Sequence, residues 1–251
     1  MKVSPIYSNN YYVKKNVNFA SSERIVYKHL PNRTYSNFTS FLRPDFDWIS
    51  FIKFIKEKYG NLTKVNIINH ACSDGSEPYT LAMLIKEAFK DFAKNFLPIK
   101  AYDFDAEIIN YAKNKQILIK HDDIYRLSTD IPQWNSKYLK VVQNQGMGTP
   151  IKVSPTEELD SAVVFEKKNI LDDFVGQKLS NTIILTRNMW AYLRIAEQET
   201  LMEHLFESMD DSCLLVLGAL EKTYGIDNML EKRGFVKTSV DYVYTKPTFK
   251  N

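Results

Sequence analysis

The segment Asn69–Leu84 has the residues of a ligand-binding turn. An apolar run, Val65–Ile68, ends in a short loop of small and polar residues, and an amphipathic helix follows directly. This order of strand, tight loop and helix presents backbone N–H groups and a helix N-terminus to a nucleotide-like ligand. The loop has one glycine, Gly75, so it does not match the G-x-G-x-x-G pattern of generic dinucleotide-binding turns.

A second chemical signal is the acid-rich end of the next apolar strand, Ala101–Asp105. In folds of this kind, an acid at the end of the second strand accepts hydrogen bonds from the ribose hydroxyls of the ligand. The alternative is that an aspartate here only caps the helix that begins near Ala106. We assign the helix cap to Asp105 and the ribose to Asp103.

Hydrophobic periodicity predicts the elements that must position these residues. Apolar residues from Trp48 to Tyr59 recur at helical spacing, between Pro44 in the first turn and Gly60 at the C-terminal stop. After this helix, strands and helices alternate. The expected strands are 65–69, 99–103, 162–166, 182–186 and 213–217, and the expected helices are about 77–96, 106–115, 195–208 and 226–232.

Two pairs of short β-like runs predict hairpins. Tyr138–Val142 and Pro150–Val153 flank a glycine-bearing loop, and Phe235–Ser239 is followed by Tyr242–Thr245. The fold class that we predict is therefore α/β. It has a doubly wound, mostly parallel sheet, an antiparallel C-terminal hairpin and a small β-hairpin insertion at about 138–154.

The loop around Gly75 resembles a motif of one enzyme family. It is similar to G-C-S-T-G-E-E-P-Y-S-L-A-M of the CheR-type chemotaxis receptor methyltransferases, which bind S-adenosylmethionine (SAM). The residues that match are Cys72, Ser73, Gly75, Glu77, Pro78, Tyr79, Leu81, Ala82 and Met83. Two neighbouring segments carry the likeness further: Ala101–Asp105 resembles the family's A-T-D-I-D, and Asn37–Arg43 resembles N-x-T-x-F-F-R.

The later part of the chain keeps the same order of family motifs. Val164–Leu171 resembles V-x-F-x-x-x-N-L-L, and Ile183–Leu193 resembles V-I-F-C-R-N-V-L-I-Y-F. Leu215–Glu221 resembles L-F-L-G-H-S-E but lacks the His and Ser. The chain is identified as CheR-like from Asn37 onward, and the resemblance implies a sheet of the SAM-dependent methyltransferase type.

The resemblance also implies roles for individual residues. Asn169 and Ile170 would face the adenine, and Glu77 would contact the methionine amino group or support the loop that does so. On sequence alone, Arg43 would be read as a surface residue just ahead of a helix, so its role in the pocket depends on the resemblance. The expected cofactor-binding residues are Asn37, Thr39, Arg43, Glu77, Asp103, Asn169, Ile170, Arg187 and Asn188, and the expected catalytic residues are Arg43 and Tyr192.

Two departures from the family bear on domain organisation. CheR-type enzymes have a helical domain ahead of the N-x-T segment, and residues 1–36 are too few for it. We expect a basic N-terminal arm at 1–36, with one helical segment around Ser22–His29, and a methyltransferase domain at 37–251. The positive charge of the arm would be solvated or would face an acidic protein partner. The insertion loop lacks the arginines with which some members grip a receptor tail, so we expect no tethering to that tail.

Charge and composition exclude several other classes. A net charge of +3 is too small to argue for nucleic acid as a partner. Cys72 and Cys213 do not form a disulfide or zinc pattern, and the four histidines lack ligand spacing, so we expect no metal. We find no signal peptide and no apolar run long enough to insert into a membrane, and we expect a cytoplasmic protein. Lys120–Asp123 is interpreted as a solvated turn.

The sequence thus favours SAM-dependent methyl transfer to a protein glutamate carboxylate, with S-adenosylhomocysteine as the product. The expected partner is a protein that carries an acidic side chain, with a chemoreceptor as one candidate. A second hypothesis is a catalytically inactive SAM-binding regulator, since residues 219 and 220 depart from the family. A third is a methyltransferase for another acceptor, such as a small acid or RNA.

Overall fold

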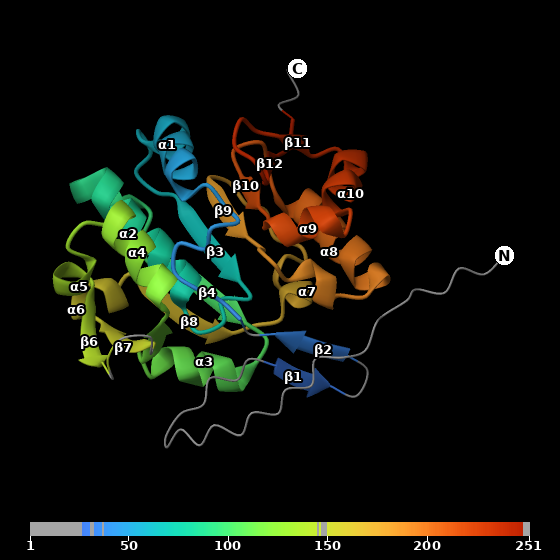
Figure 1. The fold of residues 1–251 in the computed structure, drawn as a ribbon. Helices are drawn as coiled ribbons and strands as arrows, with labels where there is room; N and C mark the ends of the chain where they lie inside the picture. Colours follow the sequence, from blue (N-terminus) through green and yellow to red (C-terminus); the bar gives the residue numbers. More distant parts are fainter. Residues whose placement is uncertain (1–26, 31–32, 37, 145, 147–149, 248–251) are drawn as a thin grey trace.

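A seven-stranded sheet forms the centre of the protein, in a computed structural model that describes residues 27–30, 33–36, 38–144, 146 and 150–247 (Figure 1). The strand order is β11-β12-β10-β9-β3-β4-β8. The strands are β3 (Asn66–His70), β4 (Ile99–Asp103), β8 (Val163–Lys167), β9 (Thr182–Leu185), β10 (Leu214–Val216), β11 (Val236–Lys237) and β12 (Val243–Thr245).

The sheet is mostly parallel, and its one antiparallel edge is at the C-terminus. Strands β10, β9, β3, β4 and β8 pair in parallel, whereas β12 runs antiparallel to β10 and to β11. Parallel neighbours bring their carboxyl ends to the same edge, which is where the chemistry-bearing loops were expected. The predicted fold class, including the C-terminal hairpin, is confirmed.

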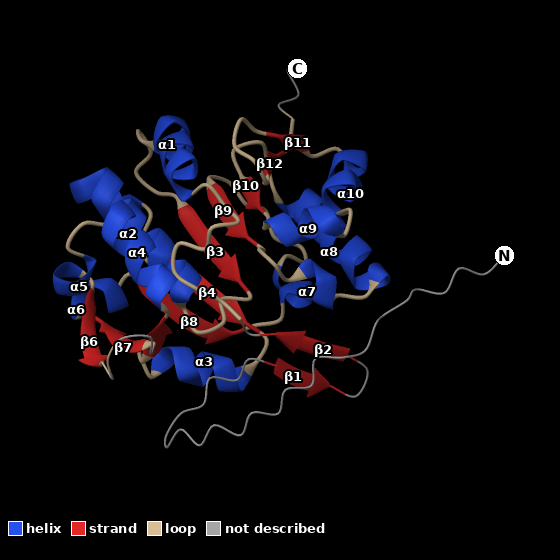
Figure 2. Ribbon diagram, viewed as in Figure 1, coloured by secondary structure: helices blue, strands red, loops and turns tan. Residues whose placement is uncertain are grey.

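Helices cover both faces of this sheet, with α1 and α2 on one side and α8 and α10 on the other (Figure 2). The longer helices are α1 (Trp48–Tyr59), α2 (Ser76–Phe89), α3 (Ala106–Lys113), α4 (His121–Asp130), α8 (Ile195–Ser208) and α10 (Ile226–Arg233). The shorter ones are η1 (Lys90–Asn95), α5 (Trp134–Lys137), α6 (Glu157–Asp160), α7 (Ile170–Asp173), η2 (Trp190–Tyr192) and α9 (Ala219–Thr223). The helix expected at 77–96 changes to 3₁₀ geometry after Phe89, because Lys90 has a positive φ of 51°.

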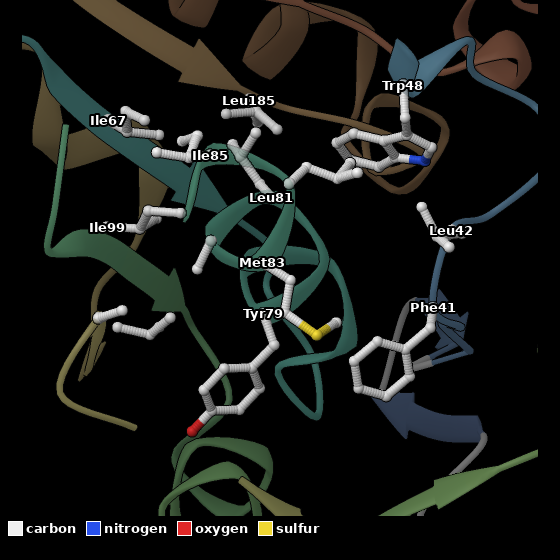
Figure 3. Close-up of a cluster of buried hydrophobic side chains, with 14 of the residues drawn as sticks. Phe41, Leu42, Trp48, Ile67, Tyr79, Leu81, Met83, Ile85, Ile99 and Leu185 are labelled. Carbon is white, nitrogen blue, oxygen red and sulfur yellow. The ribbon is translucent and has the colours of Figure 1, made fainter. Parts of the chain in front are cut away.

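Two apolar clusters, one on each face of the sheet, hold the helices in place. The larger contains α1 and α2, and Figure 3 shows Leu81 and Ile85 of α2 directed toward Ile67 and Leu185 of the sheet. The smaller lies under α8 and α10 and includes Trp190. Full burial of a side chain such as Leu or Ile stabilises the fold by roughly 1.5–3 kcal/mol. The two clusters therefore hold the strands whose ends carry the polar residues.

The predicted insertion is a three-stranded sheet with the order β5-β7-β6. Its hairpin, β6 (Leu139–Gln143) with β7 (Ile151–Pro155), is confirmed, and β5 (Ile117–Ile119) adds a strand that the sequence did not predict. The interpretation of Lys120–Asp123 as a solvated turn is correct for the exposure of Lys120, His121 and Asp122, and wrong for the geometry and for Asp123, because α4 begins at His121. Asp123 is buried at the start of α4, where it accepts hydrogen bonds from the Lys120 backbone N–H and from Arg126.

A small antiparallel hairpin precedes the domain and consists of β1 (Tyr27–Leu30) and β2 (Arg33–Ser36). The expected helix around Ser22–His29 is therefore wrong from Tyr27 onward, and its earlier part lies outside the described residues, as does most of the expected basic arm. Backbone pairing with β2 outweighs the local helical pattern here. Among the described residues, no helix has both the length and the apolar character needed to cross a membrane.

Candidate active site

A cavity of about 330 Å³ opens at the carboxyl ends of β3, β4 and β9. Its walls come from five places in the sequence: the segment before α1, the β3–α2 loop, the end of β4, the start of α7, and the β9–η2 segment with the residues that follow it. The sequence-predicted residues that line it are Thr39, Arg43, Glu77, Asp103, Asn169, Ile170, Arg187, Asn188 and Tyr192. Asn37, the remaining one, lies outside the described residues.

The β3–α2 loop needs its glycine for two reasons. Gly75 has a φ of 91°, a conformation that L side chains rarely adopt, and a Cβ there would lie 2.7 Å from the Phe165 ring. Asp74 fixes the start of α2, because its carboxylate accepts hydrogen bonds from the N–H and the hydroxyl of Ser76. The loop therefore passes close to the β8 side chain and reaches the cavity through Ala71 and Ser73.

Asp103 is a buried carboxylate in the cavity wall, with 4% of the residue exposed. It accepts hydrogen bonds from the backbone N–H groups of Ser73, at 3.2 Å, and Asp105, at 3.0 Å. Burial raises the pKa of Asp103 to about 6, although these two N–H donors act in the opposite direction. Asp105 caps α3 by accepting the Glu107 N–H, as expected.

Two acids hold the guanidinium of Arg187, whose side chain has no exposed surface. Its Nη1 donates to Glu77 at 2.5 Å and its Nη2 donates to Asp45 at 2.8 Å. Asn69 donates to the second oxygen of Glu77 at 2.8 Å. A buried guanidinium requires such partners, so the β3–α2 loop, the β9–η2 segment and the turn before α1 are joined by charge-assisted hydrogen bonds.

A buried acid, Glu221, fixes the β9–η2 segment through hydrogen bonds to the backbone. Glu221, with no exposed surface, accepts hydrogen bonds from the N–H groups of Met189, at 2.8 Å, and Gly218, at 2.9 Å. Burial raises the pKa of Glu221 despite these donors. A Cβ on Gly218 would lie 2.6 Å from Oδ1 of Asn188, so this glycine keeps room for the Asn188 amide in the cavity wall.

The opposite wall comes from the start of α7. Asn169 caps this helix, since its Oδ1 accepts the N–H of Leu171, and Ile170 presents an apolar surface to the cavity.

A buried histidine pairs with an acid of the same helix. His70 donates from Nε2 to Asp173 at 2.7 Å, and Lys168 forms an ion pair with the same carboxylate. Burial lowers the pKa of His70, so the imidazole is neutral near pH 7. Burial alone would raise the pKa of Asp173, but hydrogen bonds from His70 and Lys168 lower it.

The sequence did not predict a role for four polar residues of this region. Three are acids, Asp45, Asp173 and Glu221, and the fourth is His70, the partner of Asp173. Asp45 lies two residues after Arg43, and Glu221 lies in a motif that was matched without a role. These positions offered a signal. The pairing of His70 with Asp173 had none, because the two residues are far apart in sequence and meet only through the sheet topology. Within the described residues, no group of three or more His, Cys, Asp or Glu could hold a metal ion.

Comparison with known proteins adds two sequence relationships. Residues 37–238 match the family described as "CheR methyltransferase, SAM binding domain". A "Chemotaxis protein methyltransferase" of Borreliella burgdorferi is 26% identical over 207 residues, which cover 80% of this chain and 69% of that protein.

Solved structures resemble the chain at lower similarity. A TehB-like SAM-dependent methyltransferase from Corynebacterium glutamicum is 12% identical with a TM-score of 0.40, covering 80% of this chain and 89% of that one. Magnesium protoporphyrin IX methyltransferase from Synechocystis, with bound SAM, is 15% identical with a TM-score of 0.39, covering 79% and 77%. Two other matching structures are much longer proteins, of which the match covers 29% and 24%.

Proposed function

The chain belongs to the CheR methyltransferase family and is a SAM-dependent methyltransferase, and we propose that it methylates the side-chain carboxylate of a protein glutamate. One observation carries the choice of acceptor. The guanidinium of Arg43 and the phenol of Tyr192 line the same cavity as Asp103, so the side chains that we assign to the acceptor carboxylate and to the donor ribose belong to one site.

The residues in the cavity fit SAM. Asp103 is a buried acceptor suited to two ribose hydroxyls. The amide oxygen of Asn188 is buried without a hydrogen-bond partner among the described residues, so a ligand N–H would satisfy it. We assign the adenine side to Asn169 and Ile170, and the methionine end to Thr39, Glu77, Arg187 and Asn188. Asn37, which lies outside the described residues, keeps its assignment to the donor from the sequence alone.

SAM supplies a methyl group that its positively charged sulfur makes electrophilic. A glutamate side chain has an unperturbed pKa of about 4.3, so it is already a nucleophilic carboxylate at pH 7 and requires no general base. The task of the protein is then to orient this carboxylate and to exclude water. We assign the orientation to Arg43, whose guanidinium fork matches a carboxylate.

Tyr192 has the second role at the acceptor end. It is half-buried at the end of η2 and lines the cavity, next to Leu193. Its hydroxyl can donate to the acceptor carboxylate, and the face of its ring is attractive to a positively charged sulfur. Both contributions would hold the two reactants in line for the transfer, and neither requires a proton transfer.

The partner that we propose is a protein with an exposed acidic side chain, and the name of the Borreliella relative makes a chemoreceptor the first candidate. Residues 143–149 carry no charged side chain, so recognition of a receptor tail through this loop is not part of the proposal. We place the reaction in the cytoplasm.

The test is incubation of the purified protein with a cell lysate and methyl-labelled SAM. Label on protein that is released as methanol by mild base identifies carboxyl methylation. Base-stable label would show another acceptor group and contradict the glutamate assignment. No transfer, together with saturable SAM binding, would favour the inactive regulator instead.

A further inference from the structure

Asp45 bridges the donor side and the acceptor side of the cavity. It lies in the turn between Arg43 and α1, and its side chain is 21% exposed. Its Oδ1 accepts from Arg187, while its Oδ2 accepts from the Asn188 amide at 3.1 Å and forms an ion pair with Nε of Arg43 at 3.3 Å. One carboxylate therefore fixes three side chains that line the cavity.

The ion pair with Arg43 uses a particular edge of the guanidinium. Asp45 contacts Nε, and within the described part of the chain the Arg43 side chain makes no other hydrogen bond or ion pair. The two terminal nitrogens remain available to a ligand carboxylate, which they can bind through two parallel hydrogen bonds. Arg43 is 26% exposed, so without Asp45 its long side chain would sample many rotamers.

Arg187 is held differently, and this difference separates the two arginines by function. Its guanidinium is fully buried, and it is bonded to Glu77 and Asp45 while it lies over the rings of Phe46 and Trp48. Such a guanidinium would act on the methionine end of the donor through its charge and through the acids that it holds in place. Arg43 is the arginine of this pair whose terminal nitrogens are unpaired among the described residues, whereas in Arg187 the unpaired nitrogen is the buried Nε.

We propose that Asp45 is a positioning residue that aims the terminal nitrogens of Arg43 at a ligand carboxylate in the cavity. Two ligands could supply this carboxylate. One is the acceptor glutamate, for which the inference rests on the proposed function, and the other is the methionine part of the donor, whose carboxylate has the same chemistry. Without Asp45, Arg43 would keep its charge but not its orientation, so it would hold the ligand carboxylate in a less reactive geometry.

The matched variants are Asp45→Asn and Asp47→Asn. Asp47 is a near neighbour that caps α1 by accepting the Ser50 N–H, and among the described residues it forms no hydrogen bond or ion pair with either arginine. Thermal unfolding of both variants establishes that they are folded. If Asp45→Asn does not fold, Asp45→Glu replaces it, because that variant keeps the negative charge beside Arg187 but moves the carboxylate relative to Nε of Arg43.

The first measurement follows the Nε–H signal of Arg43 by NMR in protein labelled with ¹⁵N-arginine. S-adenosylhomocysteine is added first, and N-acetylglutamate α-amide, which has one free carboxylate, is added second; the neutral N-acetylglutamine amide is the control. We expect the wild type and Asp47→Asn to show a shift with the acidic compound. Asp45→Asn should bind that compound at least about tenfold more weakly.

The order of addition distinguishes the sources. A shift on adding S-adenosylhomocysteine, with no further change, assigns the aimed edge to the donor carboxylate and supports the role of Asp45 while removing Arg43 from the acceptor site. A shift only with the acidic compound assigns it to the acceptor. An Arg43 signal that responds to neither ligand, or that responds equally in wild type and Asp45→Asn, overturns the inference.

The second measurement is steady-state kinetics with the acceptor that the labelling experiment identifies. We expect Asp45→Asn to lower kcat at least about tenfold with no matching rise in the donor Kd, whereas Asp47→Asn should leave both unchanged. Failure of the wild type to produce base-labile label would contradict the proposed function alone, because the NMR titration tests Asp45 without turnover.

Discussion

Replacement of Asp103 by Asn should change how stability and SAM affinity depend on pH, in opposite directions. Burial raises the pKa of Asp103 from its ordinary value of 3.8 to about 6. The folded protein therefore binds this proton more tightly than the unfolded chain, and ionisation above pH 6 costs the ligand-free fold about 3 kcal/mol. This cost develops between about pH 4 and pH 6 as the pH rises.

The quantity to measure is the change in the free energy of unfolding between the two pH values, compared between the wild type and Asp103→Asn. Between pH 7.5 and pH 5, protonation of Asp103 should return about 1.4 kcal/mol of stability to the wild type. Asp103→Asn has no such group, so its stability should change only through the other titrating residues, which both proteins share. Urea unfolding of both proteins at the two pH values gives the quantity directly. A double difference near zero would refute the assignment of a buried, ionised carboxylate to this position.

SAM affinity should follow the opposite trend, because the ribose hydroxyls donate to the ionised form. About one tenth of Asp103 is ionised at pH 5, so calorimetry should show wild-type affinity falling about tenfold between pH 7.5 and pH 5. Asp103→Asn, weaker by at least about tenfold at pH 7.5, should lack this component. Parallel pH profiles for the two proteins would remove the ribose role from Asp103.

Three further predictions concern other parts of the chain. Arg43→Ala and Tyr192→Phe should lower kcat while the SAM Kd rises only modestly; equal losses in rate and affinity would make them donor-binding residues only. Gly218→Ala should place a Cβ against Asn188 and lower the free energy of unfolding by about 1–3 kcal/mol in urea titrations, and an unchanged midpoint would contradict the close approach. A chemoreceptor-tail pentapeptide should show no saturable binding below about 1 mM by fluorescence anisotropy, whereas micromolar saturation would restore tail recognition through the loop at 143–149.

The sequence predicted the elements whose signals are local. The parallel strands, the α2 start at the Gly75 loop and the terminal hairpin follow from apolar runs, glycine and period-2 patterns, and the structure has them within a few residues. The helix α4 and the strand β5 were missed because His121–Asp130 is mostly polar and Ile117–Ile119 is short. Their buried residues, Ile117, Ile119 and Leu127, join the larger apolar cluster, many of whose other members come from distant parts of the chain.

The candidate site divides in the same way. Asp103 was predicted because an acid at a strand end is a local signal, and nine of the ten expected site residues line one cavity. Their roles in binding and catalysis remain predictions. Asp45 and His70 were missed, since a carboxylate that bridges two arginines and an imidazole that meets α7 depend on tertiary proximity.

The buried arginine connects the two ends of the cavity that we assign to the donor and to the acceptor. Arg187 has no exposed surface, so each of its two acids compensates a charge that the apolar surroundings would otherwise penalise. One of those acids, Glu77, lies in the first turn of α2, next to the loop that we assign to the donor, and the other, Asp45, also pairs with Arg43. A ligand that draws on either acid therefore acts on the same guanidinium, which provides a direct electrostatic path between the loop at Gly75 and the arginine assigned to the acceptor.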